Sequence, residues 1–359
     1  MTPASEAELA EQIVAATTPL SIRGGGTRGI ATDGTPLGTA GLSGITLYEP
    51  GAMTVVAQAG TPVAQIEAVL AAENQRLAFE PMDHRALMGT QGEPTIGGVM
   101  AANISGPRRI SVGAARDFLL GVRFVDGAGN IVKNGGRVMK NVTGYDLVKL
   151  MSGAHGTLGV LTEVSLKSLP RPETETTLIL HGLDDTAAVA ALARALGSPF
   201  EVTAAAHDPE AGETLLRVEG FEASVAYRVA ELKALLGGEI TVEQGEGDRW
   251  TAWRDVEVFA GAQGDVWRVS CKPSDAPALV AKSGAQRVRY DWAGGLIWLL
   301  TDVGYDLRGA LGSYDGHATL IRGSGQPRFE PETAGVARLT AAVRARFDPR
   351  GVLNAGLMG

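Results

Sequence analysis

Residues 95–170 read TIGGVMAANISGPRRISVGAARDFLLGVRFVDGAGNIVKNGGRVMKNVTGYDLVKLMSGAHGTLGVLTEVSLKSLP. Glycine is concentrated in this stretch, between apolar segments. Glycine weakens regular secondary structure, and it is favoured where φ must be positive or where a Cβ would strike a ligand or another backbone. Glycine clusters between apolar strands therefore indicate a cradle for a sugar-rich or nucleotide-like cofactor. The clusters are Gly97 with Gly98, Gly106, Gly113, and Gly156 with Gly159.

A second glycine-rich segment lies upstream, where residues 19–29 read PLSIRGGGTRG. A strand running into Gly24 to Thr27 offers successive backbone N–H groups and a hydroxyl to a pyrophosphate. Arg23 and Arg28 add positive charge beside it. The segment has neither a GxGxxG turn nor a Walker loop. Taken alone, it is equally compatible with a glycine-rich hairpin.

Together these motifs resemble a known superfamily. Four motifs resemble those of the FAD-binding domain of the vanillyl-alcohol-oxidase (PCMH-type) flavoproteins. They are RGGGT, TIGG followed by AN, the Gly-x-x-Arg-Asp segment and TGYDLVKLMSGAHGTLGVLTE. Three further stretches most resemble the family of FAD-binding E subunits of bacterial glycolate oxidase: GPRR, GGRVMKNVTGYD and FDPRGVLNAG. The motifs run through most of residues 20–170 and return at residues 347–356.

The resemblance and the patterning predict an α+β fold. Residues 1–172 are expected to form a two-subdomain PCMH-type FAD-binding domain, and residues 173–330 a cap domain. Residues 331–359 are expected to form a helix and a tail that returns to the FAD-binding domain. Between residues 178 and 242 the pattern is strand, helix, strand, strand, helix, strand, the order of a ferredoxin-like α+β domain. A further helix and four further strands are predicted at residues 275–283, 266–271, 288–291, 296–300 and 319–322.

Capping signals and apolar periodicity predict the elements of the first domain. Ser5 with Glu8 reads as a capping box that opens a helix with Leu9, Ile13 and Val14 on its apolar face. A second helix begins at Thr61-Pro62, with Ile66, Val69 and Leu70 facing inward. Strands are predicted at residues 45–48, 54–59, 120–126 and 158–169, a turn at 126–129 and a final helix at 331–346.

Composition restricts the class of protein. The chain has 359 residues, enough for two domains, and a net charge of -8. The acidic balance argues against nucleic acid as a partner. The sequence has no run of about twenty apolar residues, so no transmembrane segment is expected. MTPASEAELAEQ lacks a signal-peptide core, so the chain is expected to be cytoplasmic, or held at the membrane periphery through its complex.

Cys271 is the only cysteine. One cysteine cannot form a disulfide within the chain, and it cannot hold an iron–sulfur cluster that needs four thiolates. If a flavin passes electrons onward, another subunit must receive them. The resemblance implies two such partners, a catalytic flavoprotein subunit and an iron–sulfur subunit of a glycolate oxidase complex.

The glycine pattern and the resemblance together predict the FAD site. Relatives that attach FAD covalently often carry a histidine in the phosphate-binding loop, and this loop has none, so noncovalent FAD is expected. Lys140, Asn141 and Tyr145 are further candidates for contact with the cofactor, and nothing in the sequence ranks them. The predicted cofactor-binding residues are Arg23, Gly24, Gly25, Gly26, Thr27, Arg28, Thr95, Gly97, Gly98, Ala101, Asn103, Gly106, Gly113, Arg116, Asp117, Gly156, Thr157, Leu158, Gly159 and Val160.

Oxidation of a 2-hydroxy acid at a flavin requires a cation for the carboxylate and a base for the hydroxyl proton. His317, Arg322 and Arg268 are the predicted catalytic residues, because an arginine fork matches a carboxylate; ordinary surface ion pairs are the alternative for each arginine. Related catalytic dehydrogenases carry an HxGDGNxH segment near this position. Of the two histidines of that segment, this chain has only His317, and no metal site is expected.

The other four histidines have weaker signals. His155 is expected to pack beside the flavin, and His181 and His207 are expected at the surface. His84 is expected on a loop surface, with a position facing the flavin as the alternative.

Three functions are compatible with these features. The first is an FAD-binding subunit that takes part in oxidising glycolate, a small 2-hydroxy acid, to glyoxylate and passes electrons to an iron–sulfur partner. The second is a self-sufficient FAD-dependent dehydrogenase of a D-lactate-like 2-hydroxy acid. The third is a flavin-fold scaffold without FAD. The missing HxGDGNxH segment and the single cysteine favour the first.

Overall fold

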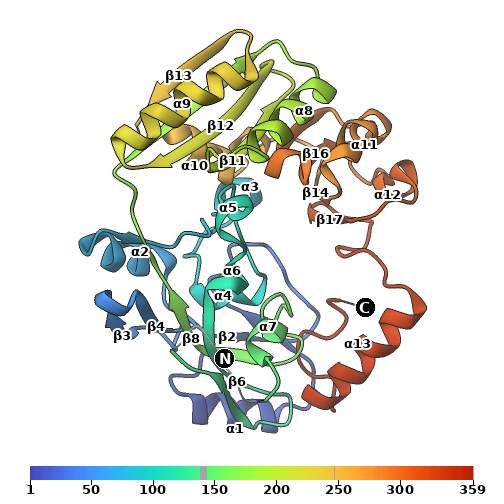
Figure 1. Ribbon diagram of the computed structural model, residues 1–359. Coiled ribbons are helices and arrows are strands. Elements are labelled where there is room, and N and C mark those ends of the chain that lie inside the picture. Colours follow the sequence, from blue (N-terminus) through green and yellow to red (C-terminus); the bar gives the residue numbers. More distant parts are fainter. Residues whose placement is uncertain (138–143, 246, 359) are drawn as a thin grey trace. The chain divides into compact units, whose positions relative to one another are not determined.

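The computed structural model describes residues 1–137, 144–245 and 247–358, and the chain divides into two compact units (Figure 1). Unit 1 comprises Met1–Ser105, Gly113–Arg171 and Pro331–Gly359, and unit 2 comprises Gly106–Val112 and Pro172–Glu330. Unit 2 resumes at Pro172, one residue before the start that the sequence predicts for the cap domain. The predicted bounds of 1–172 and 173–330 do not separate the short segment Gly106–Val112, which belongs to unit 2.

The main sheet of unit 1 has five strands in the order β3-β4-β8-β6-β7, and all its neighbours are antiparallel. Its central strand reads VLTEVSLK and buries six of its eight residues, which lie on both faces of the sheet. The predicted turn joins β6 to β7: the Gly129 N–H donates to the Asp126 carbonyl at 3.0 Å. The strands are β3 (Ile45–Glu49), β4 (Thr54–Gln58), β6 (Leu119–Val125), β7 (Ile131–Gly135) and β8 (Val160–Lys167).

A smaller parallel pair, β1 (Leu20–Arg23) and β2 (Thr35–Gly38), lies beside the C-terminal tail. Leu20 forms an isolated bridge with Leu353, and both side chains are buried in one apolar cluster with Leu9 and Ile13. The tail follows α13 (Ala334–Phe347). It therefore completes the core beneath β1.

The helices of unit 1 begin where the capping signals predict. Ser5 Oγ accepts a hydrogen bond from the Glu8 N–H and opens α1 (Glu6–Ala15). Leu9 and Ile13 are buried, but Val14 is 57% exposed, so its predicted inward position is wrong. Val14 follows Leu9 by five residues, about 140° around the helix, which places it outside the apolar stripe.

The second predicted helix, α2 (Val63–Ala72), begins directly after Pro62. Ile66 and Leu70 are buried and Val69 is half-buried. The remaining helices and strands of unit 1 are short: β5 (Gln75–Arg76), α3 (Arg85–Met88), α4 (Ile96–Ala101), α6 (Ala115–Phe118), α7 (Leu147–Met151) and β9 (Leu169–Pro170).

Unit 2 contains one antiparallel sheet of eight strands in the order β13-β10-β12-β11-β15-β16-β14-β17. The strands β13, β10, β12 and β11 have the ferredoxin-like arrangement that the sequence predicts. In this arrangement β10, the first of the four in the chain, lies between β13, the last, and β12, the third. The elements of this half are β10 (Thr174–His181), α8 (Asp185–Leu196), β11 (Val202–Asp208), β12 (Glu213–Gly220), α9 (Glu222–Leu236) and β13 (Ile240–Gln244).

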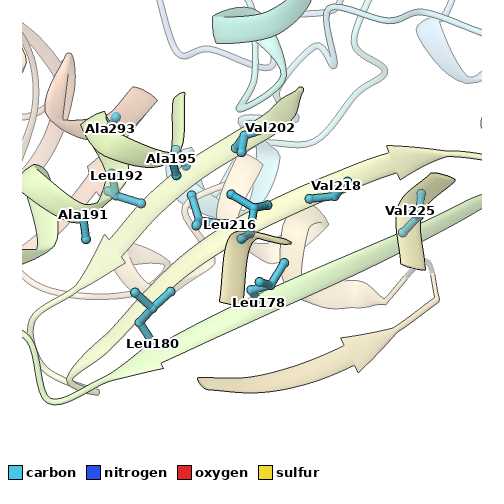
Figure 2. Packing of buried hydrophobic residues seen from close by; sticks show 12 residues of the cluster. Leu178, Leu180, Ala191, Leu192, Ala195, Val202, Leu216, Val218, Val225 and Ala293 are labelled. Carbon is cyan, nitrogen blue, oxygen red and sulfur yellow. The ribbon is translucent and has the colours of Figure 1, made fainter. Parts of the chain in front are cut away.

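Aliphatic side chains form the core of this first half. Figure 2 shows Leu178 and Leu180 of β10 beside Leu216 and Val218 of β12, with Leu192 of α8 in the same cluster. All five are nearly or fully buried. The alternating residues of the two strands thus provide one apolar face, against which the helices pack.

The second half of unit 2 extends the same sheet. A single pairing, His207 with Tyr290, joins β11 to β15. Two short helices, α10 and α12, are absent from the sequence prediction because seven and five residues are too few to show a helical period. The elements are α10 (Asp248–Arg254), β14 (Asp265–Ser270), α11 (Ala276–Ser283), β15 (Arg287–Asp291), β16 (Leu296–Thr301), α12 (Leu307–Leu311) and β17 (His317–Arg322).

His207 is fully buried, so its predicted surface position is wrong. Its strand is covered on both faces, and its ring shares hydrogen bonds with Thr214 Oγ1 at 2.9 Å and Asp185 Oδ1 at 3.3 Å. Tyr290 donates to the other oxygen of Asp185 at 2.5 Å. This network connects α8, β11 and β15 inside unit 2.

Burial lowers the pKa of His207, although the charge of Asp185 partly opposes this shift. Because the folded protein disfavours the protonated ring, the unfolded chain binds more protons below about pH 6.5, the ordinary pKa of histidine. We expect the free energy of unfolding to fall as the pH drops from about 6.5 through the lowered pKa, and His207→Gln to reduce this dependence. Urea unfolding of the full chain between pH 8 and pH 5 measures it; equal slopes in both proteins would contradict the assignment.

Candidate cofactor site

A cleft in unit 1 collects most of the predicted cofactor-binding residues. It is lined by the loop after β1, the start of α4, the segment before β8 and the C-terminal tail. These elements lie far apart in the sequence, so only the fold brings them together. The predicted residues that line the cleft are Arg23, Gly24, Gly25, Gly26, Thr27, Arg28, Thr95, Gly97, Gly98, Ala101, Gly156, Gly159 and Val160.

The two glycine loops approach each other too closely for side chains. A Cβ on Gly24 would lie 2.3 Å from Thr95 Oγ1, and a Cβ on Gly25 would lie 1.6 Å from the Glu93 carbonyl oxygen. Gly26 has φ +72°, which L side chains rarely adopt. The loop after β1 is therefore held against the loop that precedes α4.

α4 begins inside the cleft. Thr95 is its N-cap, and its hydroxyl accepts a hydrogen bond from the Gly98 N–H at 3.3 Å. Gly97 lies against the loop after β4, where its N–H donates to the Ala59 carbonyl at 2.8 Å and a Cβ would lie 2.7 Å from the same oxygen. The glycines at this helix start thus permit close backbone packing under the cleft.

Another part of the cleft lining is held in place by a residue that the sequence reasoning missed. Asn354 Oδ1 accepts from the Ile22 N–H at 2.7 Å, and Asn354 Nδ2 donates to the His155 carbonyl at 2.8 Å. His155 has φ +51° and is followed by Gly156 with φ +74°. One tail residue therefore connects β1 to the segment that precedes β8. The motif FDPRGVLNAG was the signal that could have identified it.

His84 is 5% exposed and lines the cleft, so its predicted loop-surface position is wrong. The segment before it is apolar, and Leu77, Ala78 and Phe79 are buried. His84 Nδ1 lies 3.3 Å from the Met82 carbonyl oxygen. Met82, Ile104 and Leu357 also line the cleft without having been predicted to do so, and so does His155, which was expected to pack beside the flavin.

Several predicted residues lie in unit 1 but do not line the cleft, and their described contacts are structural. Asn103 Oδ1 accepts from the Arg116 N–H, and Asp117 Oδ2 accepts from the Ala114 N–H beside Gly113. Thr157 donates to the Ala154 carbonyl, and Leu158 is buried. As cofactor contacts these residues remain predictions.

Four residues singled out in the sequence analysis, Gly106, Lys140, Asn141 and Tyr145, are not among those that line the cleft in the described part of the chain. Gly106 belongs to unit 2, where its carbonyl accepts from Trp292 Nε1 at 3.1 Å. Lys140 and Asn141 lie outside the described residues. Tyr145 is 87% exposed.

In unit 2, two arginines stack on one tryptophan. The guanidinium carbons of Arg109 and Arg268 lie 4.6 and 5.0 Å from the ring centroid of Trp292. Burial and the charge of Arg109 lower the pKa of Arg268 to about 10. His317 pairs across the sheet with Ser270, which follows Arg268 by two residues, so His317 and Arg268 lie on the same face of the sheet. Desolvation and the charge of Arg268 lower the pKa of His317.

The structure does not bring Arg322 to this cluster. Its guanidinium donates to the carbonyls of Phe259 at 2.9 Å and Ala262 at 2.6 Å. Arg322 thus fixes a turn of the backbone. The cluster instead contains Arg109, whose proximity to Arg268 no sequence pattern could reveal.

Neither a metal cluster nor a membrane-spanning helix is found in the described ranges. Residues 1–137, 144–245 and 247–358 contain no group of three or more His, Cys, Asp or Glu side chains that could hold a metal ion. No helix in that part of the chain is long and apolar enough to cross a membrane.

Asn354 provides a test of the assembled wall. Asn354→Ala leaves the Ile22 N–H and the His155 carbonyl without these partners, and each buried loss costs about 1–3 kcal/mol. Asn354→Asp keeps the acceptor for Ile22 but places a carboxylate oxygen against the His155 carbonyl, so its melting temperature should lie below that of the wild type and no higher than that of the alanine variant. Scanning calorimetry measures this order; three equal transitions would rule out the bridging role.

Comparisons with known proteins agree with this geometry. Residues 1–135 match the FAD binding domain family. The chain is 35% identical over 356 residues to glycolate oxidase subunit GlcE of Escherichia coli (strain K12), covering 98% of this chain and 95% of that protein. It is 37% identical over 127 residues to glycolate oxidase subunit GlcD of Bacillus subtilis (strain 168), covering 35% of this chain and 26% of that protein.

The fold has a solved counterpart in alkyldihydroxyacetonephosphate synthase. The match has a TM-score of 0.71 and 15% identity, and it covers 99% of this chain and 76% of the other. This likeness concerns the fold. Because the match to GlcE extends over nearly the whole of both chains, the chain belongs to the GlcE family of glycolate oxidase subunits and carries an FAD-binding domain within residues 1–135.

Proposed function

We propose that this chain is the FAD-carrying subunit of a complex that oxidises glycolate to glyoxylate. The observation that carries the proposal is the glycine-lined cleft of unit 1, most of whose lining residues lie within residues 1–135, the segment that matches the FAD binding domain family. Glycolate is proposed as the substrate because the GlcE relative is a glycolate oxidase subunit. The flavin would pass its electrons to an iron–sulfur partner subunit.

The residues of the cleft fit an FAD. Arg23, Arg28 and the backbone of the loop between them would hold the pyrophosphate, because a concave run of N–H groups with flanking arginines suits an anion. When bound, FAD supplies a two-electron acceptor. Attachment is proposed to be noncovalent. The buried ring of His84 would contact the cofactor from the same cleft.

The need for an electron-accepting partner follows from the cysteine content. Cys271 is the only cysteine of the sequence, whereas a cluster held by thiolates uses four. Burial raises the pKa of Cys271 to about 11, so the thiol stays protonated near neutral pH. If the flavin transfers its electrons to an iron–sulfur cluster, that cluster would therefore belong to another chain.

A second candidate function is favoured by the cluster in unit 2. Arg268 and His317 on one face of the sheet, with Arg109 stacked on the same Trp292 ring as Arg268, would bind the carboxylate of a small 2-hydroxy acid. A chain that binds both FAD and this carboxylate would be a self-sufficient dehydrogenase. In that reading Arg268 holds the carboxylate and His317, whose lowered pKa keeps it neutral near pH 7, accepts the hydroxyl proton.

Anaerobic absorbance separates the two functions. For a relay subunit, we expect the flavin of the isolated chain to stay oxidised with glycolate or D-lactate and to bleach once the partner subunits are present. Bleaching of the isolated chain would instead support self-sufficient catalysis, and Arg268→Gln should then raise the KM about tenfold or more through loss of a charged hydrogen bond. A chain that purifies without flavin and does not take it up would contradict both.

Gly25 tests the cofactor cleft directly. Gly25→Ala places a Cβ 1.6 Å from the Glu93 carbonyl oxygen, so the two loops must separate. We expect at least a tenfold loss of bound flavin per polypeptide, measured as the ratio of flavin to protein absorbance after gel filtration. Gly51→Ala is the matched control, because Gly51 is exposed and its Cβ would meet nothing within 4 Å. Equal flavin content in both variants would show that the packing of these two loops is not needed for flavin binding.

A further inference from the structure

α13 differs from the other long helices of the chain. Among the described helices of ten or more residues, α1, α2, α8 and α9 each bury two or more side chains, whereas α13 buries none. An isolated helix of about 14 residues is marginal in water, and helices in proteins gain most of their stability by packing an apolar face. α13 (red in Figure 1) therefore has a face that the described chain leaves uncovered.

The uncovered face carries three aliphatic side chains. Val336, Leu339 and Val343 are 49%, 69% and 36% exposed, and their spacing of i, i+3 and i+7 places them on one side of the helix. We call these three residues the α13 stripe. The same spacing recurs where a helix inserts anchor side chains into an apolar groove of another polypeptide.

The charge of the helix contrasts with that of the chain. α13 contains Arg338, Arg344 and Arg346 and no Asp or Glu, although the whole chain has a net charge of -8. Arg346 is exposed beside the stripe. A partner that covers the stripe is thus favoured if it carries carboxylates at the edge of its groove.

The C-terminal end of α13 is fixed to unit 1. Phe347 packs against Phe124 with ring centroids 6.2 Å apart, and its carbonyl accepts from the Gly127 N–H at 2.8 Å. Arg344 donates to the Met358 carbonyl at 2.9 Å. These contacts hold the helix at its last turn while the stripe stays exposed, so the helix presents the stripe without unfolding.

We propose that the α13 stripe is the docking surface for a partner subunit of the oxidase complex, which covers it with an apolar groove rimmed by carboxylates. This inference rests on the proposed function, in which the chain works within a complex. The occupant is another polypeptide rather than a lipid surface, because three aliphatic side chains without an aromatic residue bury little apolar area in a bilayer. A second copy of this chain is a less favourable occupant, because two arginine-rich helices would face each other.

The test uses the full-length chain co-expressed with the GlcD-type flavoprotein subunit of the same organism. Leu339→Glu introduces a carboxylate into the stripe. Ala341→Glu introduces the same carboxylate on the opposite, exposed face of the same helix and serves as the matched control. Complex formation is measured as mass by gel filtration with light scattering, and affinity is measured by titration of the purified subunits.

We expect Leu339→Glu to weaken the complex at least tenfold, Arg346→Glu to weaken it to a smaller extent, and Ala341→Glu to behave as wild type. The flavin content of the isolated chain should be the same in all of them, which separates this test from that of the cofactor cleft. A wild-type complex that is unaffected by Leu339→Glu would overturn the docking proposal alone.

Three other outcomes would also overturn it. If the wild-type chain bound vesicles of phosphatidylserine and phosphatidylcholine and Leu339→Glu abolished only that binding, the stripe would be a lipid contact. If it formed a dimer that Leu339→Glu dissociated, the occupant would be a second copy. If it bound no partner subunit under any condition, complex membership in the proposed function would fail together with the docking surface.

Discussion

The close approach of two backbone loops is the constraint on which the cofactor cleft depends. The loop after β1 meets the loop before α4 so tightly that a Cβ on Gly25 would overlap the Glu93 carbonyl. Glycine at this point removes the side chain that would separate the loops, at the cost of greater chain entropy in the unfolded state. Once the loops meet, Thr95 can cap α4, and the helix start lies beside the arginines of the first loop.

The sequence predicts those features that depend on neighbouring residues. The glycine loops, the capping of α1, the hairpin between β6 and β7 and the ferredoxin-like order all follow from local patterns. The cleft positions of His84 and Asn354 do not: the partners of Asn354 lie far away in the chain, and His84 lines a cleft whose other walls come from distant segments. The same applies to Arg109, which meets Trp292 from a distant part of the sequence, and to Arg322, whose carbonyl partners are 63 and 60 residues away.

A buried ion pair explains why a short segment of the glycine-rich stretch belongs to unit 2. Arg108 forms two hydrogen bonds of 2.8 Å with Glu219, and both side chains are less than a tenth exposed. Arg217 lies 3.7 Å from the same carboxylate. Desolvation offsets much of the Coulomb energy of such a pair, whereas removal of one partner costs about 3–5 kcal/mol. We interpret the pair as fixing where the segment docks rather than as adding net stability.

This arrangement also separates two roles that glycine plays in the same stretch. The chain leaves unit 1 after Ser105 and returns at Gly113, and Ser105 Oγ accepts from the Ala115 N–H across the two ends. Gly113 has φ +94°, and a Cβ there would lie 2.9 Å from Asp117 Oδ2. Its glycine is therefore explained by a turn of the backbone, without any ligand. Glycine density thus indicates close approach in general, and only the fold distinguishes approach to a cofactor from approach to another part of the chain.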